Sequence, residues 1–357
     1  MSNDDSVYRE LQKHLDKMPV GFPATESGVE LRLLKTLFTP EQARIATGMD
    51  YKCRTVEQIL AQLPGCGFSV AELEIKLEEM ADRGNTFAKK QDGVKVYANM
   101  PLVVGMLELQ VPRLSLSMLK DIEDYFQEKF AGEFLRTPVR QTRVIPIQKS
   151  ITAGHRTGTY DELRDLIEKA EGRIRVGECM CRKGMQMANH TCAITTRKET
   201  CLSFRELADL MGRAGWGRPI SKEEALEIAA KNEEDGLVLQ PGNEQEIQFI
   251  CSCCGDCCGI LKTAKAMPKP SEFLTTNYYA QVDPELCNGC SACVDRCQMD
   301  AVAVENDTAA INRDRCIGCG LCVSTCAVEA IELKNKPKEH IPPKDMEALL
   351  ETIMAHK

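Results

Sequence analysis

The sequence predicts an α+β protein built from several domains. Three observations support this prediction: helix-start signals and a turn signal fill the first third of the chain, short strands and helices alternate in the middle, and one cysteine pattern occurs twice near the C-terminus. A chain of 357 residues is long enough for two or three domains, each with a core of its own.

The N-terminal third is expected to hold three helices followed by a hairpin. A capping box begins each helix, at "TPEQ" (39), "TVEQ" (55) and "SVAE" (69), and Pro40 occupies a first helical position. The alternating residues on either side of "KQDGV" are typical of a β-hairpin. This order predicts a winged-helix-like domain over residues 28–110, preceded by an N-terminal arm over residues 1–27.

Winged helices often bind DNA, but the charge of this one opposes that role. The helix that would contact DNA, "SVAELEIKLEEMADRG", carries a net charge of −3, which repels phosphate. The whole chain has a net charge of −8, so it lacks a general attraction to nucleic acid or to an anionic membrane. We therefore expect a protein-docking module and no nucleic-acid partner.

The chain contains 19 cysteines, far more than an ordinary core uses. An odd number argues against a complete disulfide framework. The first residues show no signal-peptide pattern and no apolar run approaches the roughly 18 residues of a membrane span, so we expect a cytoplasmic protein without such a span. Thiols stay reduced in the cytoplasm, and dense cysteine there indicates metal or redox chemistry.

Two stretches near the C-terminus share one cysteine spacing. "CNGCSACVDRC" at 287–297 and "CIGCGLCVSTC" at 316–326 are both Cys-x2-Cys-x2-Cys-x3-Cys. This is the spacing of bacterial two-cluster ferredoxins, and residues 276–335 resemble such a pseudo-twofold domain. The resemblance implies two [4Fe–4S] clusters, because the fourth cysteine of each run ligates the other cluster. The implied ligands are Cys287, Cys290, Cys293 and Cys326 for one cluster, and Cys316, Cys319, Cys322 and Cys297 for the other.

The residues around these cysteines fit the resemblance with one departure. Gly289, Gly318 and Gly320 lack a Cβ, so the backbone can curl closely around a cluster. Residues 301–314 predict a short hairpin between the two runs. Ferredoxins of this type usually carry proline after the fourth cysteine, whereas Gln298 and Ala327 stand there in this chain.

Residues 111–275 are expected to form a small α/β domain that supports a second set of cysteines. Capping boxes at "TYDE" (159) and "SKEE" (221) predict two helices, and "EIQFI" before residue 251 predicts a strand. "ECMCRKGMQMANHTCAITTRKETC", at 178–201, has little apolar periodicity and is predicted to be a loop. The candidate metal ligands here are Cys179, Cys181, Cys192, Cys201, Cys253, Cys254, Cys257 and Cys258, with Cys251 as a weaker candidate.

Three hypotheses remain for these nine cysteines. They can hold one or two further iron–sulfur clusters or one cluster plus a zinc site, a structural zinc ion bound by four thiolates or by three with His190, or no metal at all. The adjacent pairs Cys253-Cys254 and Cys257-Cys258 fit poorly around one tetrahedral ion and better around a multi-iron cluster or between two clusters. Iron–sulfur binding is therefore the favoured hypothesis, and zinc is the alternative.

The chain as a whole resembles a family of ferredoxin-domain iron–sulfur proteins found mainly in anaerobic bacteria and archaea. Members join "CxCR" and "CCGxCC" segments to a C-terminal dicluster ferredoxin, as "CMCR" at 179 and "CCGDCC" at 253 do here. Arg182, which follows Cys181, could offset the charge of a ligated cluster.

These observations predict an electron-transfer protein or subunit that relays single electrons between other redox subunits in anaerobic metabolism. A flavoprotein or a large oxidoreductase is the expected kind of partner, and residues 336–357 predict a tail with a docking helix. No dinucleotide-binding fingerprint, P-loop or Ser–His–Asp pattern indicates an enzyme acting on its own. The alternatives are a redox-sensing winged-helix regulator and a reductase that binds substrate at an open iron of a cluster.

Overall fold

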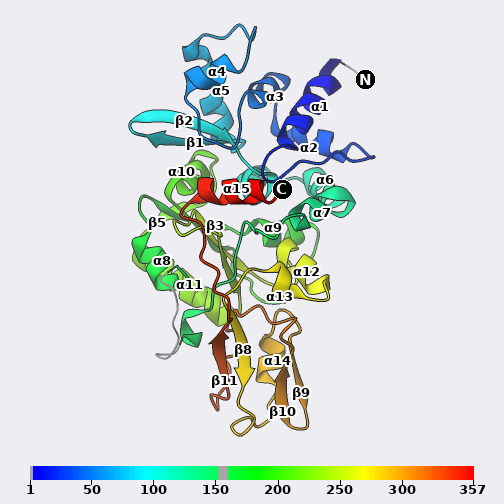
Figure 1. Cartoon of the computed structure of the whole chain (residues 1–357), viewed down its shortest axis with the longest axis vertical. Helices are drawn as coiled ribbons and strands as arrows, with labels where there is room; N and C mark the ends of the chain where they lie inside the picture. Colours follow the sequence, from blue (N-terminus) through cyan, green and yellow to red (C-terminus); the bar gives the residue numbers. More distant parts are fainter. Residues whose placement is uncertain (1–2, 152–159) are drawn as a thin grey trace. The chain divides into compact units, whose positions relative to one another are not determined.

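The computed structural model describes residues 3–151 and 160–357, which mix helices and sheets as expected for an α+β protein of several domains (Figure 1). The chain forms two compact units. The first contains Met1–Val139, Glu206–Gly217 and Leu350–Lys357, and the second contains Arg140–Arg205 and Arg218–Leu349. This division into two units does not test the boundaries of the five segments predicted from the sequence. Those boundaries stay predictions.

The first unit is mainly helical, with one hairpin. The predicted capping boxes are confirmed, because the side chains of Thr39, Thr55 and Ser69 each accept the backbone N–H three residues on. The predicted hairpin is confirmed as well, with Asp92 and Gly93 at its turn and both in the left-handed region. The elements of this unit are α1 (Asn3–Leu15), α2 (Val29–Leu37), α3 (Pro40–Thr47), α4 (Val56–Ala61), α5 (Val70–Asp82), β1 (Thr86–Gln91), β2 (Val94–Asn99), α6 (Leu116–Tyr125), α7 (Ala131–Leu135) and α10 (Arg205–Arg213).

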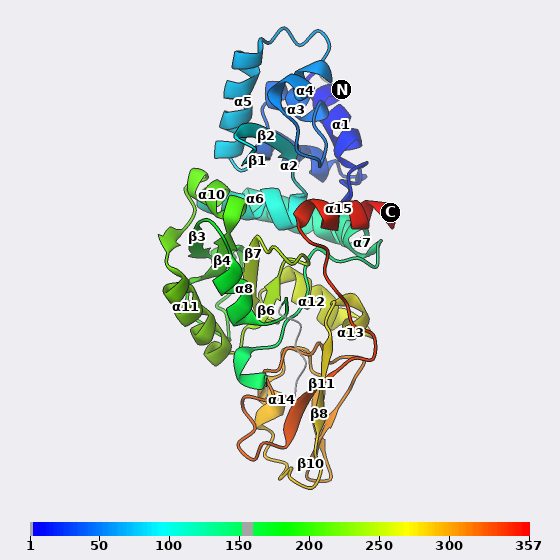
Figure 2. The same cartoon turned by 60° about the vertical axis from the view of Figure 1, so that its left-hand side comes forward.

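A five-stranded antiparallel sheet organises the first part of the second unit, in the order β5-β3-β4-β7-β6. Helix α11 packs against β3 and β4, and α8 packs against α11 (Figure 2). Of the strand predicted at "EIQFI" (246–250), only Phe249 and Ile250 are in β7, which runs on into the cysteine segment. The elements are α8 (Leu163–Lys169), β3 (Ile174–Glu178), α9 (Met180–Met187), β4 (Glu199–Phe204), β5 (Arg218–Ile220), α11 (Lys222–Asp235), β6 (Val238–Pro241), β7 (Phe249–Cys253), α12 (Gly259–Ala266) and α13 (Pro270–Phe273).

The prediction of a loop over residues 178–201 is wrong at both ends. Residues 180–187 form α9, and β4 starts at Glu199. Helix α9 is only eight residues long, too short to show apolar periodicity in the sequence, and β4 is held by pairing with β3 and β7 on either side. Of the two capping boxes expected in this region, the one at Ser221 is confirmed only as an N-cap, whose side chain accepts the backbone N–H of Glu224, whereas Thr159 lies outside the described residues.

The C-terminal part of the second unit contains two short antiparallel pairs. The hairpin predicted between the cysteine runs is present as β9 (Val302–Glu305) with β10 (Thr308–Ile311). Strand β8 (Tyr278–Val282) pairs with β11 (Ile331–Asn335), and α14 (Ala292–Arg296) lies beside β9. Helix α15 (Met346–Ala355), which enters the first unit at Leu350, confirms the helix expected near the C-terminus.

Candidate iron–sulfur and metal sites

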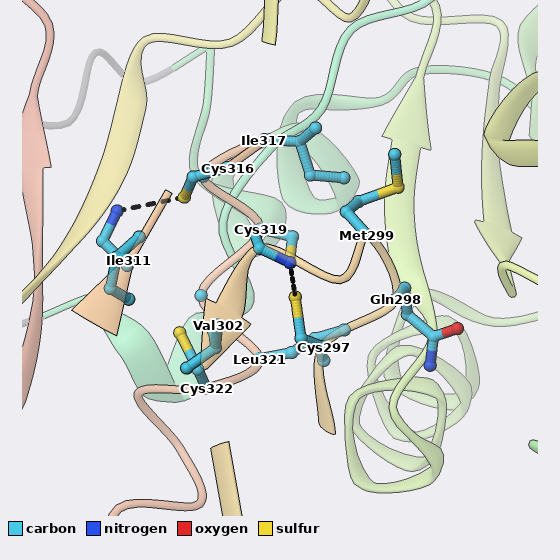
Figure 3. A pocket seen from close by; sticks show the side chains of 14 residues that line it. Cys297, Gln298, Met299, Val302, Ile311, Cys316, Ile317, Cys319, Leu321 and Cys322 are labelled. Atoms are coloured by element: carbon cyan, nitrogen blue, oxygen red, sulfur yellow. Dashed lines mark hydrogen bonds between the residues drawn. The ribbon is translucent and has the colours of Figure 1, made fainter. Parts of the chain in front are cut away.

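The eight C-terminal cysteines line two cavities, four at each. Cavity A is lined by Cys287, Cys290, Cys293 and Cys326, and cavity B by Cys297, Cys316, Cys319 and Cys322 (Figure 3 shows cavity B). The fourth cysteine of each run thus lies at the cavity of the other run, which is the grouping that the resemblance implies. The soft, four-thiolate donor sets fit [4Fe–4S] clusters, and ligation itself stays a prediction.

Glycines let the chain turn closely around both cavities. Gly289, Gly318 and Gly320 all have positive φ, between 64° and 78°. A Cβ at Gly289 would lie 2.7 Å from the carbonyl oxygen of Asp307, and a Cβ at Gly318 would lie 2.3 Å from that of Tyr278. Both distances are too short for any side chain, so the loops require glycine for backbone conformation and for space.

In each cysteine run, the sulfurs of the first and the fourth cysteine each accept a hydrogen bond from a backbone N–H group. Ala309 donates to Cys287 Sγ and Ala280 to Cys316 Sγ, both at 3.3 Å; these are the first cysteines of the two runs. The fourth cysteines, Cys297 and Cys326, accept from the alanines four residues later, at 3.3 and 3.2 Å. Figure 3 shows the two bonds at cavity B as dashed lines. Such bonds disperse thiolate charge and tune the potential of a bound cluster.

Burial raises the pKa values of three of the thiols that line cavity B. It raises the pKa of the Cys319 thiol to about 12 and moves the pKa values of Cys316 and Cys322 upward as well. These thiols are therefore protonated at neutral pH until metal binds, and metal binding must displace their protons.

Six of the nine central cysteines form a continuous chain of interacting thiols. Each thiol interacts electrostatically with the next along one line, which we call the thiol chain, in the order Cys179, Cys181, Cys258, Cys253, Cys251, Cys201. Cys251 and Cys253 lie two residues apart on β7, so their side chains share one face of the strand. The pairing of β4 with β7 brings Cys201 beside Cys251.

One thiol of the thiol chain is ionised more easily than its neighbours. Cys179 and Cys258 are the N-cap residues of α9 and α12, yet the pKa of each lies well above its ordinary value. Interaction with Cys181 and burial raise the pKa of Cys179; Cys181 lowers that of Cys258, but Cys253 and burial raise it further. Hydrogen bonds from Cys251 and Cys258 lower the pKa of Cys253 to about 6, so this buried thiol is ionised at neutral pH. The thiol chain therefore offers a first anionic ligand to a soft metal.

The other three central cysteines gather separately with an aspartate. Cys192, Cys254, Cys257 and Asp256 place one ligand atom each so that all four atoms lie within 4.8 Å of one another. We call this the compact group. The structure thus divides each adjacent pair: Cys253 and Cys258 belong to the thiol chain, and Cys254 and Cys257 to the compact group.

A buried arginine lies between the two central groups. Arg182 Nη1 donates to the carbonyl of Ser252 at 3.1 Å and lies 4.0 Å from Cys254 Sγ. Although burial opposes its charge, the pKa of Arg182 is raised by its interactions with Cys179, Cys254 and Cys253. Its position fits the charge-offsetting role expected from the sequence.

Gln298 joins the central cysteines to cavity B. Its Oε1 accepts the backbone N–H of Gly255 at 2.9 Å, and its Nε2 donates to the carbonyl of Gly236 at 3.2 Å. Gln298 also lines cavity B and follows Cys297 directly. A Cβ on Gly255 would lie 2.7 Å from the Gln298 carbonyl oxygen, so glycine is required at this approach.

Comparison with protein families supports the C-terminal part of this description. Residues 277–335 match a family model described as a 4Fe-4S dicluster domain. The C-terminal domain is therefore an iron–sulfur domain of the ferredoxin type. The chain gave no significant match to a curated protein or to a solved structure. None of the helices described is long and apolar enough to cross a membrane.

Proposed function

We propose that this protein is an iron–sulfur electron-transfer component that relays single electrons between partner oxidoreductase subunits in anaerobic metabolism. The observation that carries the proposal is that all the cysteine sites lie in the second unit, with a hydrogen-bonded connection between the central cysteines and cavity B. Cavities A and B belong to one dicluster domain, and Gln298 links the wall of cavity B to the turn that contains Cys254 and Cys257.

In this proposal the thiol chain holds a third cluster. Cys253 interacts with three other members of the thiol chain, Cys179, Cys181 and Cys258. These four cysteines match the four thiolates that ligate a cubane cluster. The remaining members, Cys201 and Cys251, lie at one end of the line. Electrons then pass between this cluster and cavity A by way of cavity B.

The relay is tested by measuring whether the clusters of the intact protein are reduced while a partner enzyme turns over its substrate. We expect the protein, isolated anaerobically from its source, to co-purify with an oxidoreductase subunit, and the substrate of that partner to bleach the cluster absorbance. The double variant Cys287→Ser, Cys326→Ser removes two ligands of cavity A and should still co-purify while electron delivery falls at least tenfold. Clusters that stay oxidised during turnover of every co-purified partner would contradict the relay.

Within this proposal, α3, α4, α5 and the β1–β2 hairpin form a winged-helix-like docking module. Three acidic side chains of α5 are paired with one cation of the hairpin and one of α10. Lys95 contacts Glu74 and Glu78 at 2.9 and 3.3 Å, and Arg213 contacts Glu78 and Asp82 at 2.8 and 2.7 Å. Two lysines of the hairpin, Lys89 and Lys90, are not among these pairs, but α5 itself is acidic, which disfavours contact with phosphate and favours a protein partner.

The regulator hypothesis predicts DNA binding, and we expect none. Fluorescence anisotropy with duplex DNA should show no salt-dependent binding of the full-length protein, because α5 is acidic and phosphate contacts supply most of the affinity. The variant Glu79→Lys, Asp82→Lys changes two acidic positions of α5 and shows whether the assay detects an electrostatic gain. Strong binding by the unaltered protein at low salt, falling steeply as salt is added, would favour a regulator instead.

A further inference from the structure

The compact group has the dimensions of a tetrahedral site for one ion. Cys192 Sγ lies 3.6 Å from Cys254 Sγ and 3.7 Å from Asp256 Oδ1. Around a tetrahedral zinc ion with Zn–S of about 2.3 Å and Zn–O of about 2.1 Å, two sulfurs are about 3.8 Å apart and a sulfur and an oxygen about 3.6 Å apart. Two of the separations therefore match a tetrahedral zinc site, and the other ligand atoms, all within 4.8 Å of one another, lie close enough to complete it.

The cysteines of the ferredoxin domain are arranged differently. Those of cavities A and B stand around a space that many other residues also line. Throughout residues 3–151 and 160–357, no other group of three or more His, Cys, Asp or Glu residues gathers its ligand atoms as closely as the compact group. The same chain thus contains wide four-cysteine sites and one narrow site, and the narrow site suits a single ion.

The surroundings of Asp256 hold its carboxylate in place. Asp256 Oδ2 accepts the backbone N–H of Ala193 at 2.9 Å and lies 3.5 Å from His190 Nε2. That histidine nitrogen is buried and has no hydrogen-bond partner among the described residues. The hydrogen bond from Ala193 thus holds Oδ2, and Oδ1 is left facing Cys192.

An apolar shell and a cation complete the environment. Cys254 and Cys257 are buried with Leu237, and Met185 and Ile194 pack against them. Three thiolates and a carboxylate around a divalent ion leave excess negative charge, and Arg182, at 4.0 Å from Cys254 Sγ, lies where it offsets part of that charge. Soft thiolates with one carboxylate form a donor set that zinc accepts.

We propose that Cys192, Cys254, Cys257 and Asp256 bind one zinc ion, separately from the iron–sulfur clusters. All four positions are taken by protein ligands, so the site is closed and structural. The ion ties the segment after α9 to the turn between Cys254 and Cys257. Because Gly255 in that turn donates to Gln298, the ion also steadies the wall of cavity B.

Zinc K-edge X-ray absorption on the intact, anaerobically prepared protein tests the ligand set directly. We expect one zinc per chain with three sulfur neighbours at about 2.3 Å and one oxygen at about 2.0–2.2 Å. A protein that lacks zinc when produced with zinc in the medium, or a zinc ion without sulfur neighbours, would overturn the proposal.

Variants of Asp256 separate zinc from iron. Asp256→Ala should lose about one zinc per chain with iron content unchanged, whereas Asp256→Cys should retain zinc with a fourth sulfur neighbour. Asp92→Asn, in the β1–β2 turn, is the matched control and should change neither metal. A loss of about four irons in Asp256→Ala would assign the compact group to a cluster and reject the zinc site. The relay is judged separately, by cluster reduction during partner turnover.

Discussion

Replacing both Cys253 and Cys258 by serine is expected to remove about four iron atoms from the intact protein, from about twelve to about eight. These two residues lie in the middle of the thiol chain, where each contacts the other and one further thiol. Without them the remaining thiols cannot supply four ligands around one cubane. Iron and sulfide analysis under anaerobic conditions measures the loss, and the reduced dicluster domain should keep its electron paramagnetic resonance signal.

The neighbouring pair provides the matched control for this experiment. The variant Cys254→Ser, Cys257→Ser changes the same two dipeptides but affects the compact group, so its iron content should stay near that of the unaltered protein while zinc falls. If both double variants lose iron equally, the nine central cysteines form one site and the division into two groups is wrong. An unaltered protein with only about eight irons would exclude the third cluster altogether.

Alanine at Gly318 is expected to abolish the cluster of cavity B. The added Cβ would lie 2.3 Å from the carbonyl oxygen of Tyr278 and 2.9 Å from Thr276 Oγ1, so β8 and the cysteine loop would have to separate. The φ of +64° adds a backbone cost of about 1–2 kcal/mol. We expect about four fewer irons per chain and a reduced protein without magnetic interaction between two clusters.

Gly93→Ala is the control for the energetic cost of the left-handed backbone conformation alone. Gly93 has a φ of +82°, but a Cβ there meets no atom within 4 Å. This variant should lose a small amount of stability and keep its full iron content. Retention of all iron by Gly318→Ala would show that the loop can move away from β8, and that cavity B does not need the close approach.

The sequence predicted the local elements best where a short pattern determines them. Three capping boxes and the Asp92–Gly93 turn depend on contacts within four residues, and the structure contains all of them. The grouping of Cys297 and Cys326 with the opposite cysteine run followed from the resemblance to a repeated motif. Helix α9 was missed because eight residues carry too little periodicity.

Tertiary contacts decided what the sequence left open at the central cysteines. Spacing alone does not show that Cys253 and Cys254 belong to different groups, because their partners come from α9, β4 and the segment between them. Asp256 was not a candidate ligand, since an aspartate between two cysteine pairs resembles an ordinary turn residue. Its only sequence signal was its position inside "CCGDCC".

The two hydrogen bonds of Gln298 limit how freely the C-terminal domain can be exchanged in a chimaera. A free-standing ferredoxin with proline at this position lacks the side-chain amide that satisfies Gly255 N–H and the Gly236 carbonyl. Splicing such a ferredoxin onto residues 1–275 would leave both groups unpartnered, at about 1–3 kcal/mol for each one that stays buried. A working chimaera therefore has to carry glutamine into the donor domain.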